Sequence, residues 1–138
     1  MKMRCKMLAM LMAVLTMFLC VVMPINAAIA EPDVEPLWEN TASVTISLGF
    51  PDDGYAEATV FGKSGVTQII IDVYVYRQSG SSWIYVAQKH ATISNRIGSI
   101  SCQFTAMSNT YYRADYTFTI TRNGVDEIIQ ETKYRTCE

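Results

Sequence analysis

The chain has 138 residues and a formal net charge of −2; half of its residues are hydrophobic and 17% are charged. The charges are unevenly distributed. All thirteen acidic residues but only eight of the eleven basic ones lie after residue 30, so residues 31–138 carry a net charge of −5. Binding to nucleic acid without sequence preference needs a basic stripe, which this acidic segment lacks. Composition therefore excludes a general nucleic-acid-binding protein and disfavours binding to anionic lipid surfaces.

The first thirty residues have the three parts of a secretory signal peptide. They begin with three basic residues, Lys2, Arg4 and Lys6. An apolar run over 7–23 follows, and Ala28 and Ala30 are small residues at the two positions that a signal peptidase reads. We therefore predict a signal peptide over 1–30, cleavage after Ala30, and a protein that is secreted or held at the cell envelope.

Two other fates of this leader are open. If it is not cleaved, its seventeen apolar residues are slightly fewer than the roughly 20 that span a bilayer. Cys20 could instead be lipidated, although the bulky Leu19 precedes it where lipoprotein signals carry a small residue. Cleavage is the fate that we expect, and it leaves no stable membrane insertion.

The rest of the chain divides into a short tether and one domain. Residues 31–40 are acidic, contain Pro32 and Pro36 and show no periodicity, which predicts an extended acidic tether. The remaining length is sufficient for a single domain with its own core. We place this domain at residues 41–138.

From residue 43 onward, apolar and polar residues alternate with the period of two that indicates half-buried β-strands. Seven strands are predicted, over residues 43–50, 55–62, 66–76, 83–93, 96–104 and 112–121 and after Gly124. In the third strand, the charge of Asp72 marks the wet face, so the odd-numbered isoleucines and valines are expected inside. In the fourth strand, Trp83, Tyr85 and Ala87 are expected to share one face.

This pattern predicts the fold class. Seven short strands at a spacing of roughly 8–14 residues, without a convincing helical period, favour an all-β, antiparallel two-sheet sandwich. A closed barrel is the alternative. The Cys-Trp-Cys order of antibody domains is absent, because Trp83 precedes both cysteines of the domain.

Asn123-Gly124 is a strong signal for a hairpin between the last two strands. A two-residue loop would bring two carboxylates, Glu127 and Glu131, onto the apolar face. A three-residue loop would leave both in solvent, and a slip of one residue turns every side chain over. We therefore predict the longer loop. Its register pairs Phe118 with Ile128, Tyr116 with Gln130, and Tyr112 with Tyr134.

The domain has two cysteines, Cys102 and Cys137. In an exported chain, two cysteines most simply form one disulfide, which would contribute roughly 3–4 kcal/mol by closing a long loop. Free thiols and a bond between chains are the alternatives. No Cys-x-x-Cys sequence is present, so redox catalysis is not expected.

Candidate catalytic and metal-binding residues are few. His90 is the only histidine and is predicted as a solvated strand residue, whereas hydrolytic triads and zinc sites commonly depend on histidine. Asp52 and Asp53 read as a turn without further calcium ligands. Asp72 and Asp115 could act on sugars only if the fold brought them together. We predict no enzyme activity, no metal and no cofactor.

Aromatic residues are the feature that best suggests binding. Fourteen of the residues after residue 30 are Phe, Trp or Tyr. Tyr74 and Tyr76 occupy the polar phase of their strand, and Trp83 with Tyr85 could stand near them. Exposed aromatics can stack on sugars or anchor a protein, whereas buried ones only cover a core. Both interpretations are open for these four residues.

Four segments of the chain are distinctive in their order: Tyr55 to Val60, Ser79 to Trp83, Tyr112 to Tyr116, and Asn123 to Glu127 with the late Cys137. Together they resemble a loose group of small exported β-sandwich proteins of Gram-positive bacteria. This resemblance implies an immunoglobulin-like sandwich and export, and it transfers no catalytic residue.

Three functions follow as hypotheses. The first is a secreted, non-enzymatic binding module for an extracellular protein or glycan. The second is a carbohydrate-binding domain with Tyr74, Tyr76, Trp83 and Tyr85 as its platform. The third is a secreted antibacterial or toxin-like protein.

Overall fold

The computed structural model describes residues 37–138. The predicted signal peptide, its cleavage after Ala30, the alternative lipidation of Cys20 and most of the predicted tether lie outside the described residues. Within residues 37–138, the structure contains strands and turns and no helix.

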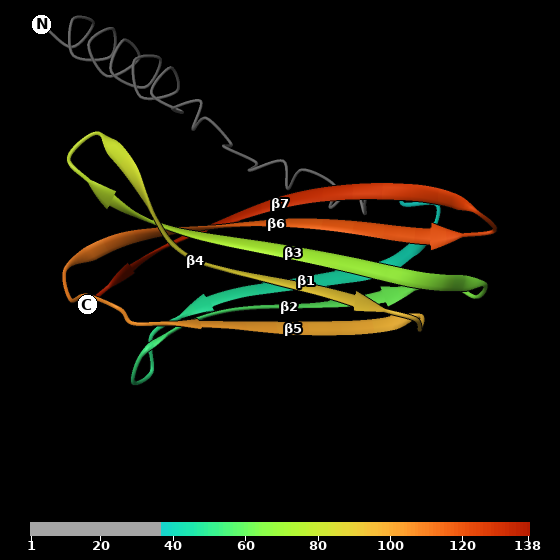
Figure 1. Cartoon of the computed structure of the whole chain (residues 1–138), viewed down its shortest axis with the longest axis horizontal. Coiled ribbons are helices and arrows are strands. Elements are labelled where there is room, and N and C mark those ends of the chain that lie inside the picture. Colours follow the sequence, from blue (N-terminus) through green and yellow to red (C-terminus); the bar gives the residue numbers. More distant parts are fainter. Residues whose placement is uncertain (1–36) are drawn as a thin grey trace, which may run out of the picture. The chain divides into compact units, whose positions relative to one another are not determined.

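Seven strands form two antiparallel sheets (Figure 1). The strands are β1 Thr41–Gly49, β2 Gly54–Gly62, β3 Val66–Ser79, β4 Ser82–Ile93, β5 Ile97–Phe104, β6 Thr110–Arg122 and β7 Val125–Cys137. One sheet has the order β1-β2-β5 and the other the order β4-β3-β6-β7. The two sheets pack face to face, which confirms the predicted two-sheet sandwich and rules out the closed barrel.

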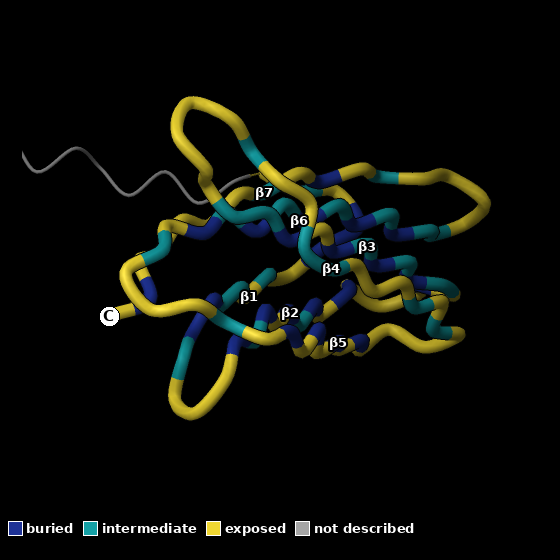
Figure 2. The backbone as a smooth tube through the Cα atoms, turned by 60° about the vertical axis from the view of Figure 1, so that its left-hand side comes forward, coloured by how far each residue is buried: buried dark blue, intermediate teal, exposed yellow. Residues whose placement is uncertain are grey.

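The core fills the space between the sheets, where Figure 2 shows the buried positions. In β3, the predicted inner residues from Ile69 to Val75 are fully buried. The even-numbered residues of β6, from Tyr112 to Ile120, are buried beside them on the inner face of the same sheet. Each large apolar side chain buried in this way stabilises the fold by about 1.5–3 kcal/mol.

The hydroxyl groups of two buried tyrosines form hydrogen bonds with the backbone. The hydroxyl of Tyr116 donates to the carbonyl of Ser47 at 2.6 Å, and that of Tyr112 accepts from the N–H of Met107 at 2.8 Å. Burial raises the pKa of the Tyr116 phenol well above its ordinary value, with smaller contributions from Cys102 and Glu57. Both rings therefore belong to the core, and the bond to Ser47 joins the two sheets.

The hairpin between β6 and β7 differs from the prediction. Its loop has two residues, because Arg122 pairs with Val125. The loop residues Asn123 and Gly124 both have positive φ, 53° and 74°, as a type I′ turn requires. Phe118 therefore pairs with Ile129 rather than with Ile128. The predicted three-residue loop was wrong. It was chosen to keep the carboxylates of Glu127 and Glu131 in water, but β7 carries both on its inner side, where each is half-buried.

Glu127 shows why this register is stable. Its carboxylate accepts hydrogen bonds from the N–H of Glu39 at 2.5 Å, the N–H of Asn40 at 3.2 Å and the hydroxyl of Thr41 at 2.7 Å. The charge is thus placed where residues 39–41, which lead into β1, supply three donors. At the other end of the same strand, Arg135 donates to the carbonyl of Leu48 at 3.2 Å. These bonds hold β1 against the edge of β7.

The last residues of the predicted tether are part of the domain. Asn40 is buried, and its side-chain amide donates to the carbonyls of Ile120 at 2.9 Å and Val125 at 3.1 Å. The ammonium of Lys63 donates to the carbonyl of Trp38, whose ring packs against the core. The folded domain therefore begins before residue 41.

Candidate binding face

The outer face of the four-stranded sheet gathers most of the exposed aromatic side chains of the described residues. One row crosses all four strands, because Tyr85 of β4 pairs with Tyr76 of β3, Tyr76 pairs with Arg113 of β6, and Arg113 pairs with Tyr134 of β7. The pleat of a sheet places paired residues on the same side. The row therefore presents three tyrosines around one arginine.

A β-bulge in β4 brings Tyr85 into this row. Val75 pairs with Ala87 but Tyr76 pairs with Tyr85, so Val86 is an extra residue in β4. A bulge re-aims the side chains that precede it. Tyr85 consequently lies on the outer face while Ala87 packs inward against the core. The prediction that Trp83, Tyr85 and Ala87 share one face was wrong for this reason.

Trp83 completes the cluster from the end of the β3–β4 hairpin, which projects from the body of the sandwich in Figure 1. Its ring centroid lies 5.9 Å from that of Tyr111 and 6.1 Å from that of Tyr134. Tyr111 and Tyr134 stack at 5.9 Å with an interplanar angle of 16°, and Tyr76 meets Tyr85 edge-on at 6.3 Å. We call these five rings, with the arginine between them, the aromatic cluster.

Arg113 is the centre of the aromatic cluster. Its guanidinium carbon lies 4.6 Å from the ring centroid of Tyr76 and 4.8 Å from that of Trp83. Each cation–π contact of this kind contributes about 0.5–1 kcal/mol at partly exposed sites. The guanidinium also donates to Asp115 at 3.0 Å, and Asp115 accepts a second bond from the hydroxyl of Thr132 at 3.1 Å. The Nε of Arg113 is buried without a hydrogen-bond partner.

The four predicted binding residues are all on this face. Tyr76, Trp83 and Tyr85 belong to the aromatic cluster, and Tyr74 lies two residues along β3 from Tyr76 with 40% of its surface exposed. The sequence reasoning missed Tyr111, Tyr134 and Arg113. The two-residue hairpin would have revealed Tyr134 and Arg113, because it pairs these two residues, whereas the predicted register paired Tyr134 with Tyr112.

An open hollow of about 330 Å³ lies on the outer face of the paired strands β6 and β7, beside the aromatic cluster. Six outward side chains border it: Arg113, Asp115, Thr117, Gln130, Thr132 and Tyr134. Its walls thus combine one aromatic ring with hydroxyl, amide, carboxylate and guanidinium groups. This mixture matches small polar ligands better than apolar ones.

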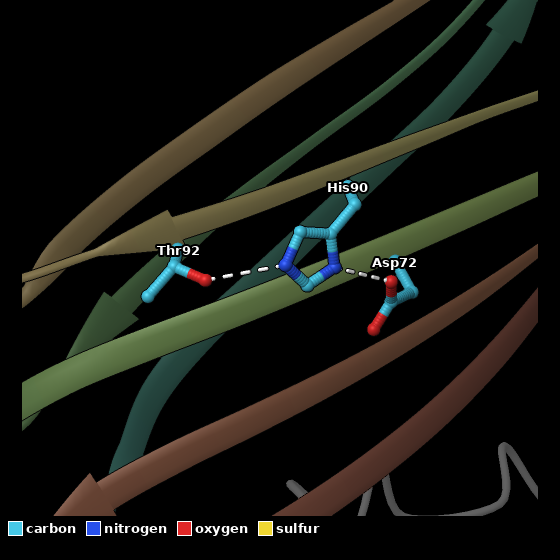
Figure 3. A network of polar contacts seen from close by, with 3 residues as sticks. All are labelled: Asp72, His90 and Thr92. Carbon is cyan, nitrogen blue, oxygen red and sulfur yellow. Dashed lines mark hydrogen bonds and ion pairs between the residues drawn. The ribbon is translucent and has the colours of Figure 1, made fainter.

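A second polar group lies on the same sheet face (Figure 3). The Nδ1 of His90 is 2.7 Å from Asp72, and its Nε2 is 3.2 Å from the hydroxyl of Thr92. The order hydroxyl, imidazole and carboxylate is that of a hydrolytic triad. That chemistry also needs donors aimed at an oxyanion and a nucleophile sheltered from water. His90 is 61% exposed, so we assign this group to the polar surface.

The two cysteines do not form the predicted disulfide. Cys102 and Cys137 are both free and buried. Cys102 lies in β5, which neighbours β2 and β4, whereas Cys137 ends β7, which neighbours β6 and β1. The strands β5 and β7 are thus edge strands at opposite edges of the two sheets, whereas a disulfide needs Cα atoms within roughly 4.4–6.8 Å of each other. Burial raises the pKa of the Cys102 thiol, an effect that Lys89 partly offsets.

No group of three His, Cys, Asp or Glu side chains that could hold a metal ion occurs within residues 37–138. The same described residues contain no helix that is long and apolar enough to cross a membrane.

Comparison with known proteins adds likenesses to solved structures only. No family model matches the chain, and no curated protein matches it. The chain is similar to wild-type OgpA from Akkermansia muciniphila, with 18% identity and a TM-score of 0.41 over 73% of this chain and 30% of that one. It is also similar to a protein from Archaeoglobus fulgidus, with 14% identity and a TM-score of 0.34 over 71% and 98% of the two chains.

Proposed function

We propose that this protein is an exported, non-enzymatic binding module and that it binds an extracellular protein or glycan with the aromatic cluster. One observation carries the proposal: four tyrosines on one sheet face keep much of their surface in water. Their exposed fractions are 53% for Tyr85, 48% for Tyr134, 40% for Tyr74 and 39% for Tyr111. Aromatic side chains that are rigid and exposed are typical anchors of binding interfaces.

The cluster is also organised before a partner arrives. Ring–ring contacts and the guanidinium of Arg113 fix the side chains of Tyr76, Trp83 and Tyr134. A surface whose rotamers are already restricted loses less entropy on binding. Exposed aromatics that only completed the core would not need this network on the outer side of the sheet.

An immunoglobulin-like classification of the sandwich is part of the proposal. Strands one, two and five form one sheet and strands three, six and seven the other, which follows the A-B-E and C-F-G arrangement of that fold. The fourth strand lies beside the third, as C′ does in variable-type domains. Tyr112, near the start of β6, bonds back to the backbone at Met107, which supports a tyrosine corner.

A binding assay with matched variants tests the proposal. Purified wild-type protein and the double variant Tyr85→Ala/Tyr134→Ala are co-sedimented with cell walls and with the extracellular matrix of the organism that exports it. Phe61→Ala is the control, because Phe61 is 43% exposed on the other sheet. We expect the double variant to lose at least about tenfold in affinity and the control to bind like wild type. Equal binding of all three proteins would remove the aromatic cluster from the function.

Export has its own test. N-terminal sequencing of the secreted product is expected to begin at Glu31, directly after Ala30. Retention of the uncleaved chain in the membrane fraction would contradict the export proposal.

A further inference from the structure

We infer that the hollow on the outer face of β6 and β7 is a binding site for a neutral saccharide. The inference rests on the proposed function, because the hollow adjoins the aromatic cluster, and it goes further by naming the class of ligand. Its volume of about 330 Å³ lies at the lower end of the roughly 300–1,000 Å³ of small-ligand sites.

Tyr134 supplies the stacking surface. Its ring borders the hollow, and 48% of the residue is exposed. The ring is supported by Tyr111 at 5.9 Å and by Trp83 at 6.1 Å. Sugar rings have C–H faces that pack on such aromatic surfaces and hydroxyl edges that need hydrogen bonds. A tyrosine held by two neighbouring rings provides the first requirement without further ordering.

Asp115 supplies the polar requirement. One of its oxygens accepts from the hydroxyl of Thr132 at 3.1 Å and the other from Arg113 at 3.0 Å. An ionised carboxylate has about four acceptor positions, so about two remain for hydroxyl groups of a ligand. The amide of Gln130 and the hydroxyl of Thr117 border the same hollow and offer donors as well as acceptors. This set matches the adjacent hydroxyl groups of a sugar.

The charges favour a neutral ligand over an anionic one. The carboxylate of Asp115 and the guanidinium of Arg113 form an ion pair at 3.0 Å, so the hollow carries no excess positive charge. The domain is acidic overall, because residues 31–138 have a net charge of −5. An acidic polysaccharide would therefore be repelled.

The same residues argue against two other ligands. A quaternary ammonium group would need a free aromatic cage, but Arg113 already lies over the rings of Tyr76 and Trp83. An apolar helix or peptide would cover the polar groups of Asp115, Thr132 and Gln130 without giving them partners, which is unfavourable. A neutral saccharide satisfies both the ring and the polar groups.

Titration with defined oligosaccharides tests the inference. Purified protein is titrated with neutral probes (β-1,4-linked glucose, N-acetylglucosamine and mannose oligomers and α-1,4-linked glucose oligomers) and with acidic probes (a uronic-acid polymer and a sulfated glycan). Calorimetry measures the affinity, and tryptophan emission is recorded in a Trp38→Phe background so that it reports on Trp83. The variants are Tyr134→Ala, Tyr134→Phe and Asp115→Asn, with Ile128→Ala as the control, because Ile128 is 66% exposed on the same strand.

At least one neutral oligomer is expected to bind. Tyr134→Ala and Asp115→Asn should each weaken this binding by at least about tenfold, while Tyr134→Phe and Ile128→Ala should stay within about threefold of wild type. Circular dichroism confirms that each variant is folded. Binding of acidic probes only, no binding of any neutral probe at millimolar concentration, or equal binding by Tyr134→Ala overturns the inference. If co-sedimentation still depends on Tyr85 and Tyr134 in that case, the binding module stands and only its ligand class is wrong.

Discussion

Removing the carboxylate of Glu127 should destabilise the whole domain, because one side chain joins the start of β1 to β7. Glu127 accepts three hydrogen bonds, from the N–H groups of Glu39 and Asn40 and from the hydroxyl of Thr41. Asn40 and Thr41 are 6% and 2% exposed, so in Glu127→Ala these donors would lose their partner away from bulk water.

The magnitude follows from these three bonds. A hydrogen bond to a charged group contributes about 1.5–3 kcal/mol, and an unsatisfied buried donor costs about 1–3 kcal/mol. Glu127 itself is only half-buried and the bond to Glu39 is exposed, which lowers the sum. We expect Glu127→Ala to reduce the free energy of unfolding by about 2–4 kcal/mol and Glu127→Gln, which keeps one acceptor oxygen, by about 1–2 kcal/mol.

Urea unfolding followed by circular dichroism measures this effect. With a typical m value of about 1–3 kcal/mol/M, the midpoint of Glu127→Ala should fall by about 1–2 M at unchanged m. Glu131→Ala is the matched control, since it removes a carboxylate from the same side of β7, four residues away, and should change stability by less than about 0.5 kcal/mol. If Glu127→Ala unfolds at the same urea concentration as wild type, the bridge to β1 does not stabilise the fold, and the longer hairpin loop regains support.

Three further predictions test other parts of the structure. Gly124→Ala should cost about 1–2 kcal/mol in the same urea assay, because residue 124 has a φ of 74°; an unchanged midpoint would argue against the type I′ turn. The raised pKa of Tyr116 means that the folded state keeps a proton which the unfolded chain loses at a pH of about 10, so stability should decline above this pH and decline less steeply in Tyr116→Phe; parallel curves would contradict this linkage. Alkylation in denaturant without reductant, followed by peptide mapping, should modify both Cys102 and Cys137, and a cross-linked peptide would restore the disulfide prediction.

The period of two in the sequence was sufficient to predict the sandwich. It located the inner face of β3 correctly because Asp72 is a charge on an otherwise apolar strand and marks the wet side. The clean alternation from Tyr112 to Ile120 did the same for β6. Burial on one face of a strand is a local property, and local patterns report it well.

The hairpin register was not predictable from the same kind of pattern. Glu127 looked like a residue that must face water, yet its hydrogen-bond donors come from residues 39–41, which are more than eighty positions earlier in the chain. Whether an inward carboxylate is tolerated depends on such non-local partners. The disulfide prediction failed for a related reason, since the presence of two cysteines does not indicate that Cys102 and Cys137 lie on strands at opposite edges of the sandwich.

The candidate binding face depends on two local features that an alternation pattern does not show, the bulge in β4 and the two-residue loop of the last hairpin. Without the extra Val86 in β4, Tyr85 would face Arg77 on the inner side of the sheet rather than Tyr76 on the outer side. Without the two-residue loop in the last hairpin, Tyr134 would turn away from Arg113. The bulge brings Tyr85 of β4 to the row of Arg113, and the two-residue loop brings Tyr134 of β7 to the same arginine. A bulge costs ladder hydrogen bonds, and such features are common beside functional sites. That both features lead to one exposed cluster supports the proposal that the rings are arranged for a partner and not only for the core.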